Sequence, residues 1–291
     1  MVKKSSGKAG KAVVKKPKST KARKAESVAA VAVEPVAVVE KPSFAGLQKW
    51  NLVLAGVLAA QAVALLVFGT SKSYPVFAGF LARDPLQSAA RGETVLTFAI
   101  HHLFDINLAY LLATILAIAA AAHLLAATAQ RPKYEAGLEV GVSRRRWLTY
   151  ALTGALGWTA VALLVGVQDV ALLLGGASLL VVGALGAYAC ERQTGGKLPI
   201  VVASVAAGVA WLLCGLYVLA GLLYGSALSV YVYIAFGVSM LATGAIAAGL
   251  WLSKRQTSRW ASYLFAEQTY LVISAVWLTA LAWLGFAAMA V

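Results

Sequence analysis

The sequence predicts an all-α integral membrane protein built as a seven-transmembrane-helix bundle. Hydrophobic residues make up 61% of the 291 residues and charged residues only 12%, whereas a soluble domain is about 45–50% apolar and about 25% charged. Seven apolar stretches are each long enough to cross a bilayer, which takes about 20 residues. Lys and Arg are concentrated in every second loop. Together these observations exclude a soluble enzyme and a disordered chain.

Residues 1–46 are predicted to form a disordered, basic cytoplasmic tail ahead of a membrane domain at 47–291. Residues 1–50 hold 12 Lys and Arg against three Glu, with no apolar period that could build a core. We expect a solvated tail that helps to set the topology. The alternative is a tail that attaches electrostatically to anionic lipid or nucleic acid.

The predicted spans lie at about 50–70, 105–128, 147–167, 169–190, 198–222, 229–252 and 265–289. The third and fourth are joined only by residues 166–169, which requires a tight hairpin. The connection at 71–104 is long enough to carry some structure of its own.

The loop charges predict the orientation in the membrane. The tail and the loops on its side hold 22 of the 25 basic residues, and the opposite side holds only Lys72, Arg83 and Arg91. Excess Lys and Arg mark the cytoplasmic side. We therefore expect a plasma-membrane protein with a cytoplasmic N-terminus and an extracytoplasmic C-terminus, an inverted topology compared with seven-helix receptors.

Few ionisable residues fall inside the predicted spans. Asp105, Asp169 and Glu267 lie at span ends, where we expect them near water, and His123 lies well inside a span. A proton pump needs a chain of titrating groups, so the sequence argues against a pump. His101 and His102, with Asp105, are the candidate cluster for the alternative of a small membrane transporter or enzyme. They lack further ligands, so we expect no metal site and no enzyme.

A covalently bound retinal requires a lysine amine in the apolar interior, because the chromophore is held as a Schiff base. After Lys49 the lysines are Lys72, Lys133, Lys197 and Lys254, all expected in loops. The sequence therefore predicts that no covalent retinal is bound.

Residues 47–290 resemble the heliorhodopsins. The resemblance is carried by short segments in several spans: Asn51 with Gln61, Ala120–His123, Arg146–Tyr150, Leu198–Pro199 with Trp211, Arg259–Leu264, Glu267, Tyr270, Ser274 and Ala280–Trp283. It implies a rhodopsin-like bundle of inverted topology, a homodimer, and a role closer to a sensor than to a pump.

The chain departs from that family at the positions linked to the chromophore. The family places its retinal lysine four residues after a serine, and here Ser274 is followed by Leu278 at that position. The family's counterion glutamate corresponds to Thr149, and a histidine of its first span corresponds to Leu58. The absence of the lysine and the absence of the glutamate are consistent with each other. Once the lysine is gone, a buried glutamate would have no cation as its partner and would destabilise the protein.

The resemblance leaves a possible vestigial pocket. Its predicted members are His123, Thr149, Trp211, Ser274 and Leu278. Trp277 is one residue from the lysine position, and the sequence leaves open whether it fills a vacated retinal cavity or faces lipid.

Two main functions follow from this sequence. The first is a retinal-free homologue that acts as a sensory, regulatory or interaction protein with no cofactor. Its expected partners are membrane lipid, a second copy of the chain, and a cytoplasmic protein that meets residues 144–146 and 254–259. The second is a light sensor or carrier that binds retinal or a carotenoid non-covalently.

Overall fold

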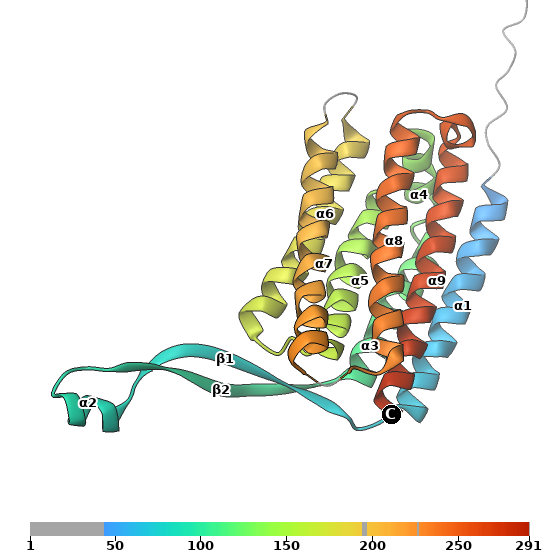
Figure 1. Ribbon diagram of the computed structural model, residues 1–291. Coiled ribbons are helices and arrows are strands. Elements are labelled where there is room, and N and C mark those ends of the chain that lie inside the picture. Colours follow the sequence, from blue (N-terminus) through green and yellow to red (C-terminus); the bar gives the residue numbers. More distant parts are fainter. Residues whose placement is uncertain (1–43, 194–196, 226, 291) are drawn as a thin grey trace, which may run out of the picture. The chain divides into compact units, whose positions relative to one another are not determined.

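The computed structural model describes residues 44–193, 197–225 and 227–290, and it contains seven helices long and apolar enough to cross a membrane (Figure 1). They are α1 (Ala45–Phe68), α3 (Leu108–Ala127), α5 (Arg144–Leu164), α6 (Val170–Arg192), α7 (Leu198–Tyr224), α8 (Val230–Lys254) and α9 (Tyr263–Ala290). The predicted seven-helix bundle is confirmed. The predicted tail lies almost wholly in residues 1–43, outside the described residues, and stays a prediction.

The helices pack mostly as sequence neighbours, and α9 closes the bundle. α5 packs against both α3 and α6, while α9 contacts α1, α3, α5 and α8. The main core therefore lies along α3, α5 and α9. At its centre the fully buried Trp158 donates a hydrogen bond of 2.9 Å from Nε1 to the carbonyl oxygen of Ala210 on α7.

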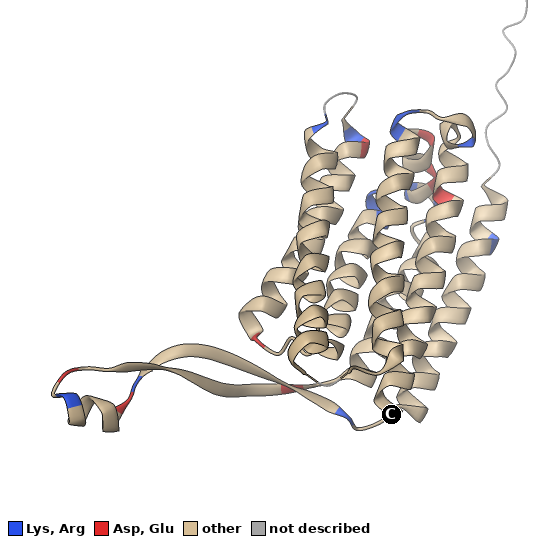
Figure 2. Cartoon of the chain, in the orientation of Figure 1, with Lys and Arg blue, Asp and Glu red and all other residues tan. Residues whose placement is uncertain are grey.

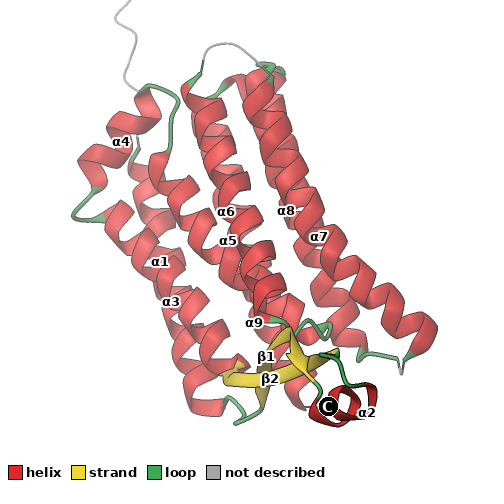
Figure 3. Cartoon of the chain, turned by 90° about the vertical axis from the view of Figure 1, so that its left-hand side faces the viewer, coloured by secondary structure: helices red, strands yellow, loops and turns green. Residues whose placement is uncertain are grey.

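The connection between the first two spans forms a β-ribbon, which the all-α prediction did not include. Strands β1 (Ser73–Arg83) and β2 (Leu96–Asn107) pair antiparallel, and the short helix α2 (Pro85–Arg91) lies between them in the chain (Figure 3). Because β2 continues to Asn107, the second span begins at Leu108 rather than at the predicted 105. The Asn107 side chain caps α3 by accepting a hydrogen bond of 3.0 Å from the backbone N–H of Tyr110.

The predicted tight hairpin between α5 and α6 is present. Gly166 adopts the left-handed conformation with φ +97°, which a side chain would disfavour. The next N–H, of Val167, donates to the carbonyl oxygen of Ala162 at 2.8 Å, and the Asp169 side chain caps α6 at Leu172. The N–H of Phe77 donates to Gln168 O at 2.8 Å and so ties the β-ribbon to this turn.

Among the residues that the structure describes, basic side chains gather at one end of the bundle. Figure 2 shows most of the described Lys and Arg near the links that join α3 to α5, α6 to α7 and α8 to α9. The first of these links contains the short helix α4 (Arg131–Glu139), and the third contains a 3-10 turn at Ser258–Ala261. We call this the basic end. The β-ribbon lies at the other end.

The close approach of α6 to Trp158 gives a test of this packing. A Cβ added at Gly176 would overlap the Trp158 ring, whereas one at Gly175 would meet nothing within 4 Å. We expect Gly176→Ala to destabilise the protein by about 1–3 kcal/mol, because the core is overpacked. Thermal unfolding in detergent measures this, with Gly175→Ala as the matched control. Equal stability of the two variants would contradict the packing described.

Candidate functional site

Four of the five predicted pocket residues line one small polar cavity of about 40 Å³. His123 comes from α3, Thr149 from α5, and Ser274 and Leu278 from α9. Trp211 does not belong with them. Its indole Nε1 donates to Thr243 Oγ1 at 3.0 Å and its ring packs against Phe236, both on α8. The inclusion of Trp211 in the pocket was therefore wrong, because it lies on α7 and faces α8.

His123 is held by a hydrogen bond to α1. The Asn51 amide nitrogen donates to Leu47 O at 2.9 Å, which leaves its oxygen to accept from Nδ1 of His123 at 2.8 Å. The bond thus joins α1 to α3 at the cavity wall. It gives this buried histidine a structural role.

The position that the resemblance assigns to a retinal lysine is apolar and shielded. Leu278 is 3% exposed and its side chain lines the polar cavity beside Ser274. The carboxylate that does line this cavity belongs to Glu267, and it is bound to Arg146. The residues that surround the cavity include no lysine.

Arg146 and two glutamates form a buried ion-pair cluster next to the cavity. One guanidinium nitrogen of Arg146 donates to Glu267 and another to Glu191. The three side chains are only 4%, 2% and 4% exposed, in the order Arg146, Glu267, Glu191. Glu267 was expected near water at a span end, and that expectation was wrong. Arg146 likewise does not belong to an accessible cytoplasmic surface.

Neighbouring polar groups complete this cluster. The Tyr134 hydroxyl on α4 donates to Glu267 Oε1 at 2.7 Å. Burial raises the pKa of Tyr134, so its hydroxyl keeps the proton that it donates. The backbone N–H of Ser143 donates to Glu191 Oε2 at 3.0 Å, and the guanidinium of Arg146 stacks 4.1 Å from the centre of the Tyr270 ring.

The ion-pair cluster joins four helices at the basic end, namely α4, α5, α6 and α9. Loss of one partner from a buried ion pair is strongly destabilising, since the remaining charge has no compensation in a medium of low dielectric constant. Sequence reasoning missed the cluster because Arg146 and Glu267 are 121 residues apart. The available signal was an arginine and two glutamates located at the ends of three different predicted spans.

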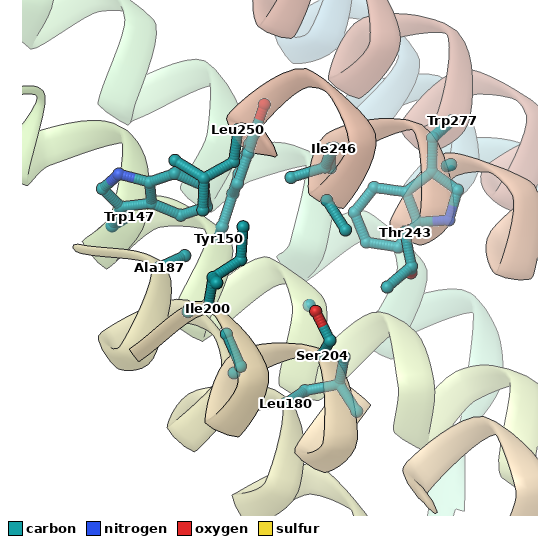
Figure 4. Close-up of a pocket in the computed structure, with 16 residues that line it drawn as sticks. Trp147, Tyr150, Leu180, Ala187, Ile200, Ser204, Thr243, Ile246, Leu250 and Trp277 are labelled. Atoms are coloured by element: carbon teal, nitrogen blue, oxygen red, sulfur yellow. The ribbon is translucent and has the colours of Figure 1, made fainter. Parts of the chain in front are cut away.

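A second, apolar cavity of about 90 Å³ lies between α5, α6, α7 and α8 (Figure 4). Its walls include Trp147, Tyr150, Ile246 and Leu250. The indole of Trp277 also lines this cavity and donates to Ser239 Oγ at 3.0 Å. Trp277 therefore points into the bundle and does not face lipid, while its filling of a vacated retinal cavity stays a prediction.

The cluster proposed for a membrane enzyme or transporter lies on the β-ribbon. His102 Nε2 is 2.9 Å from Asp105 Oδ1, and both side chains are about half exposed. His101 precedes His102 on β2, and successive side chains of a strand point to opposite faces. Across residues 44–193, 197–225 and 227–290, three or more His, Cys, Asp or Glu side chains do not converge as metal ligands.

Substitution of Arg146 tests how much the ion-pair cluster contributes to the stability of the protein. We expect Arg146→Gln to destabilise the protein by about 3–5 kcal/mol, because two buried carboxylates lose their cation. Chemical denaturation in detergent measures the change. Arg144→Gln removes the same charge from an exposed neighbouring side chain and serves as the control. Unfolding of both variants at the same denaturant concentration would show that the cluster contributes little.

Comparison with known proteins agrees with this architecture. The family model described as heliorhodopsin matches residues 47–289, which is most of the chain and all seven spans apart from the extreme ends of the first and last. No curated protein gives a match. A seven-helix membrane bundle and a family match of this extent lead to one conclusion: the chain belongs to the heliorhodopsin family.

Proposed function

We propose that this heliorhodopsin-family protein acts in the membrane as a sensory, regulatory or interaction protein that carries no covalent retinal. One observation carries the proposal. At the position that matches the family's retinal lysine stands Leu278, a buried alkyl side chain in the wall of the polar cavity. An alkyl group cannot condense with an aldehyde. The chemistry that would anchor the chromophore is therefore missing where the fold would place it.

The distribution of polar groups supports a role other than ion pumping or catalysis. At the polar cavity Arg146 is bound to Glu267, which also accepts from Tyr134, and His123 is bonded to Asn51. Toward the β-ribbon, the interior is filled by fully buried apolar side chains such as Leu65, Leu112 and Leu281. A transported ion would need coordinating or titrating groups along that half of the bundle.

Non-covalent binding of retinal or a carotenoid is the second candidate function. The small volume of the apolar cavity argues against it. The cavity measures about 90 Å³, whereas sites for drug-sized ligands measure about 300–1,000 Å³. The indole of Trp277 fills part of the space between α5 and α8, where its ring would clash with any side chain at Gly157. We therefore propose that the protein works without a cofactor.

The proposed partners follow from the surfaces. We propose a homodimer, supported by the exposed apolar side chains of the β-ribbon, among them Leu81, Phe98 and Ile100. A cytoplasmic protein partner would meet Arg144 and residues 254–259 at the basic end, while the tail would attach to anionic lipid. We propose that the protein lies in the plasma membrane with its N-terminus in the cytoplasm and its C-terminus outside.

Addition of all-trans retinal tests the central part of the proposal. We expect the purified protein to show no visible absorption band. The triple variant Leu278→Lys, Thr149→Glu, Trp277→Ala restores an amine, an acid and space, and we expect it to become coloured. The double variant Thr149→Glu, Trp277→Ala lacks the amine and should stay colourless. A band from the unaltered protein that persists after acid denaturation as a protonated Schiff base would refute the proposal.

Site-directed labelling tests the orientation. In intact cells we expect Arg91→Cys, at the end of α2, to react with a membrane-impermeant maleimide. Arg259→Cys, at the basic end, should react only after the cells are permeabilised. The native Cys190 and Cys214 are buried and give a low background. The reverse labelling pattern would place the basic end outside the cell.

A further inference from the structure

A groove at the basic end lies outside both cavities described above. It has a volume of about 670 Å³ and is formed by the end of α6, the start of α7 and the end of α8. Its walls are largely apolar and include Ile200, Val201, Val205 and Ala247. This volume lies within the range of about 300–1,000 Å³ in which proteins bind ligands of moderate size.

The rim of the groove carries three cations, Lys197, Lys254 and Arg255. Two of them are held in place. Lys254 Nζ donates to the carbonyl oxygens of Glu191 and Gln193 at 3.3 and 2.9 Å, and the guanidinium of Arg255 lies 3.8 Å from the centre of the Trp251 ring. The described side chains that line the groove include no carboxylate. The nearby Glu191 carboxylate is bonded instead to Arg146 and to the N–H of Ser143.

The first turn of α7 adds to this positive field. The helix is 27 residues long, begins at Leu198 next to Lys197, and has neither a side-chain cap nor an acidic residue in its first turn. Because Pro199 has no N–H, the donors of the first turn are the backbone N–H groups of Leu198 and Ile200, which carry a partial positive charge that favours a bound anion. The helix terminus, the cations and the apolar walls therefore occur together.

The apolar wall of the groove is exposed on the surface of the bundle. Val201 is 52% exposed and Val205 is 59% exposed, one helical turn apart on α7. Exposed apolar side chains on a membrane-spanning helix contact acyl chains. Trp251 on the opposite wall lies near the end of its span, where tryptophan commonly marks the interface between hydrocarbon and headgroups. The groove thus connects an anion-binding rim to an acyl-chain surface.

We propose that this groove binds one anionic glycerophospholipid of the surrounding bilayer. Its phosphate group lies at Lys197, Arg255 and the start of α7, and one acyl chain runs along Val201 and Val205. Basic pockets between transmembrane helices recognise anionic headgroups in this way. The site differs from the electrostatic attachment expected of the N-terminal tail, because it includes a shaped apolar wall.

Native mass spectrometry of the delipidated full chain in detergent tests the proposal, with phosphatidylglycerol and phosphatidylcholine as probes. We expect phosphatidylglycerol to bind more tightly, with one lipid retained preferentially. The double variant Lys197→Gln, Arg255→Gln should weaken its binding roughly tenfold or more, given the attraction of each cation to anionic lipid. Lys49→Gln, Arg259→Gln removes the same charge at the same end, outside the groove, and should bind as the unaltered protein does.

A second pair of variants tests the acyl-chain wall separately from charge. Val201→Trp fills the groove, whereas Val209→Trp adds the same bulk to an exposed position of α7 outside it. We expect only Val201→Trp to lose the tightly bound lipid. Equal affinity for the two lipids would overturn the proposal, as would equal losses from the two charge variants or from the two tryptophan variants. Binding of a soluble glycerol phosphate headgroup as tightly as the whole lipid would overturn it too.

Discussion

The buried guanidinium of Arg146 is the constraint on which the basic end of this bundle depends. It is paired with Glu191 on α6 and Glu267 on α9, and the second carboxylate also accepts from Tyr134 on α4. Charges removed from water are tolerated only with partners in good geometry. The relative positions of these four helices are therefore fixed by electrostatics at this end and by apolar packing around Trp158 farther along the bundle.

The same cluster determines the character of the adjacent polar cavity. Its carboxylate is already engaged by an arginine, so the cavity offers no unpaired acid to stabilise a protonated Schiff base. Leu278 and Thr149 are neutral, as a site without a chromophore cation requires. Trp277 is directed into the bundle and hydrogen-bonded to Ser239. These features are mutually consistent, and they support the proposal that this heliorhodopsin-family protein functions without covalent retinal.

The number of spans, the α5–α6 turn and most of the pocket could be predicted from the sequence. Hydropathy over about 20 residues identifies a span, and the resemblance to the heliorhodopsins indicated which positions should meet. What the sequence could not reveal were contacts between distant segments. Glu267 seemed exposed because it lies near the end of its span, whereas its partner Arg146 comes from another helix. Trp211 is also an interior side chain. The sequence does not show that it faces α8, because the rotation of α7 about its axis depends on how the helices pack. The β-ribbon has only two strands and gave no distinct pattern.

Covalent trapping on the unaltered protein tests the proposed absence of bound retinal most directly. The full chain is incubated with all-trans retinal, treated with borohydride to trap any Schiff base, denatured, and weighed by intact-protein mass spectrometry. We expect to find the mass of the unmodified chain. A retinyl adduct on a side chain within one of the seven spans would contradict it.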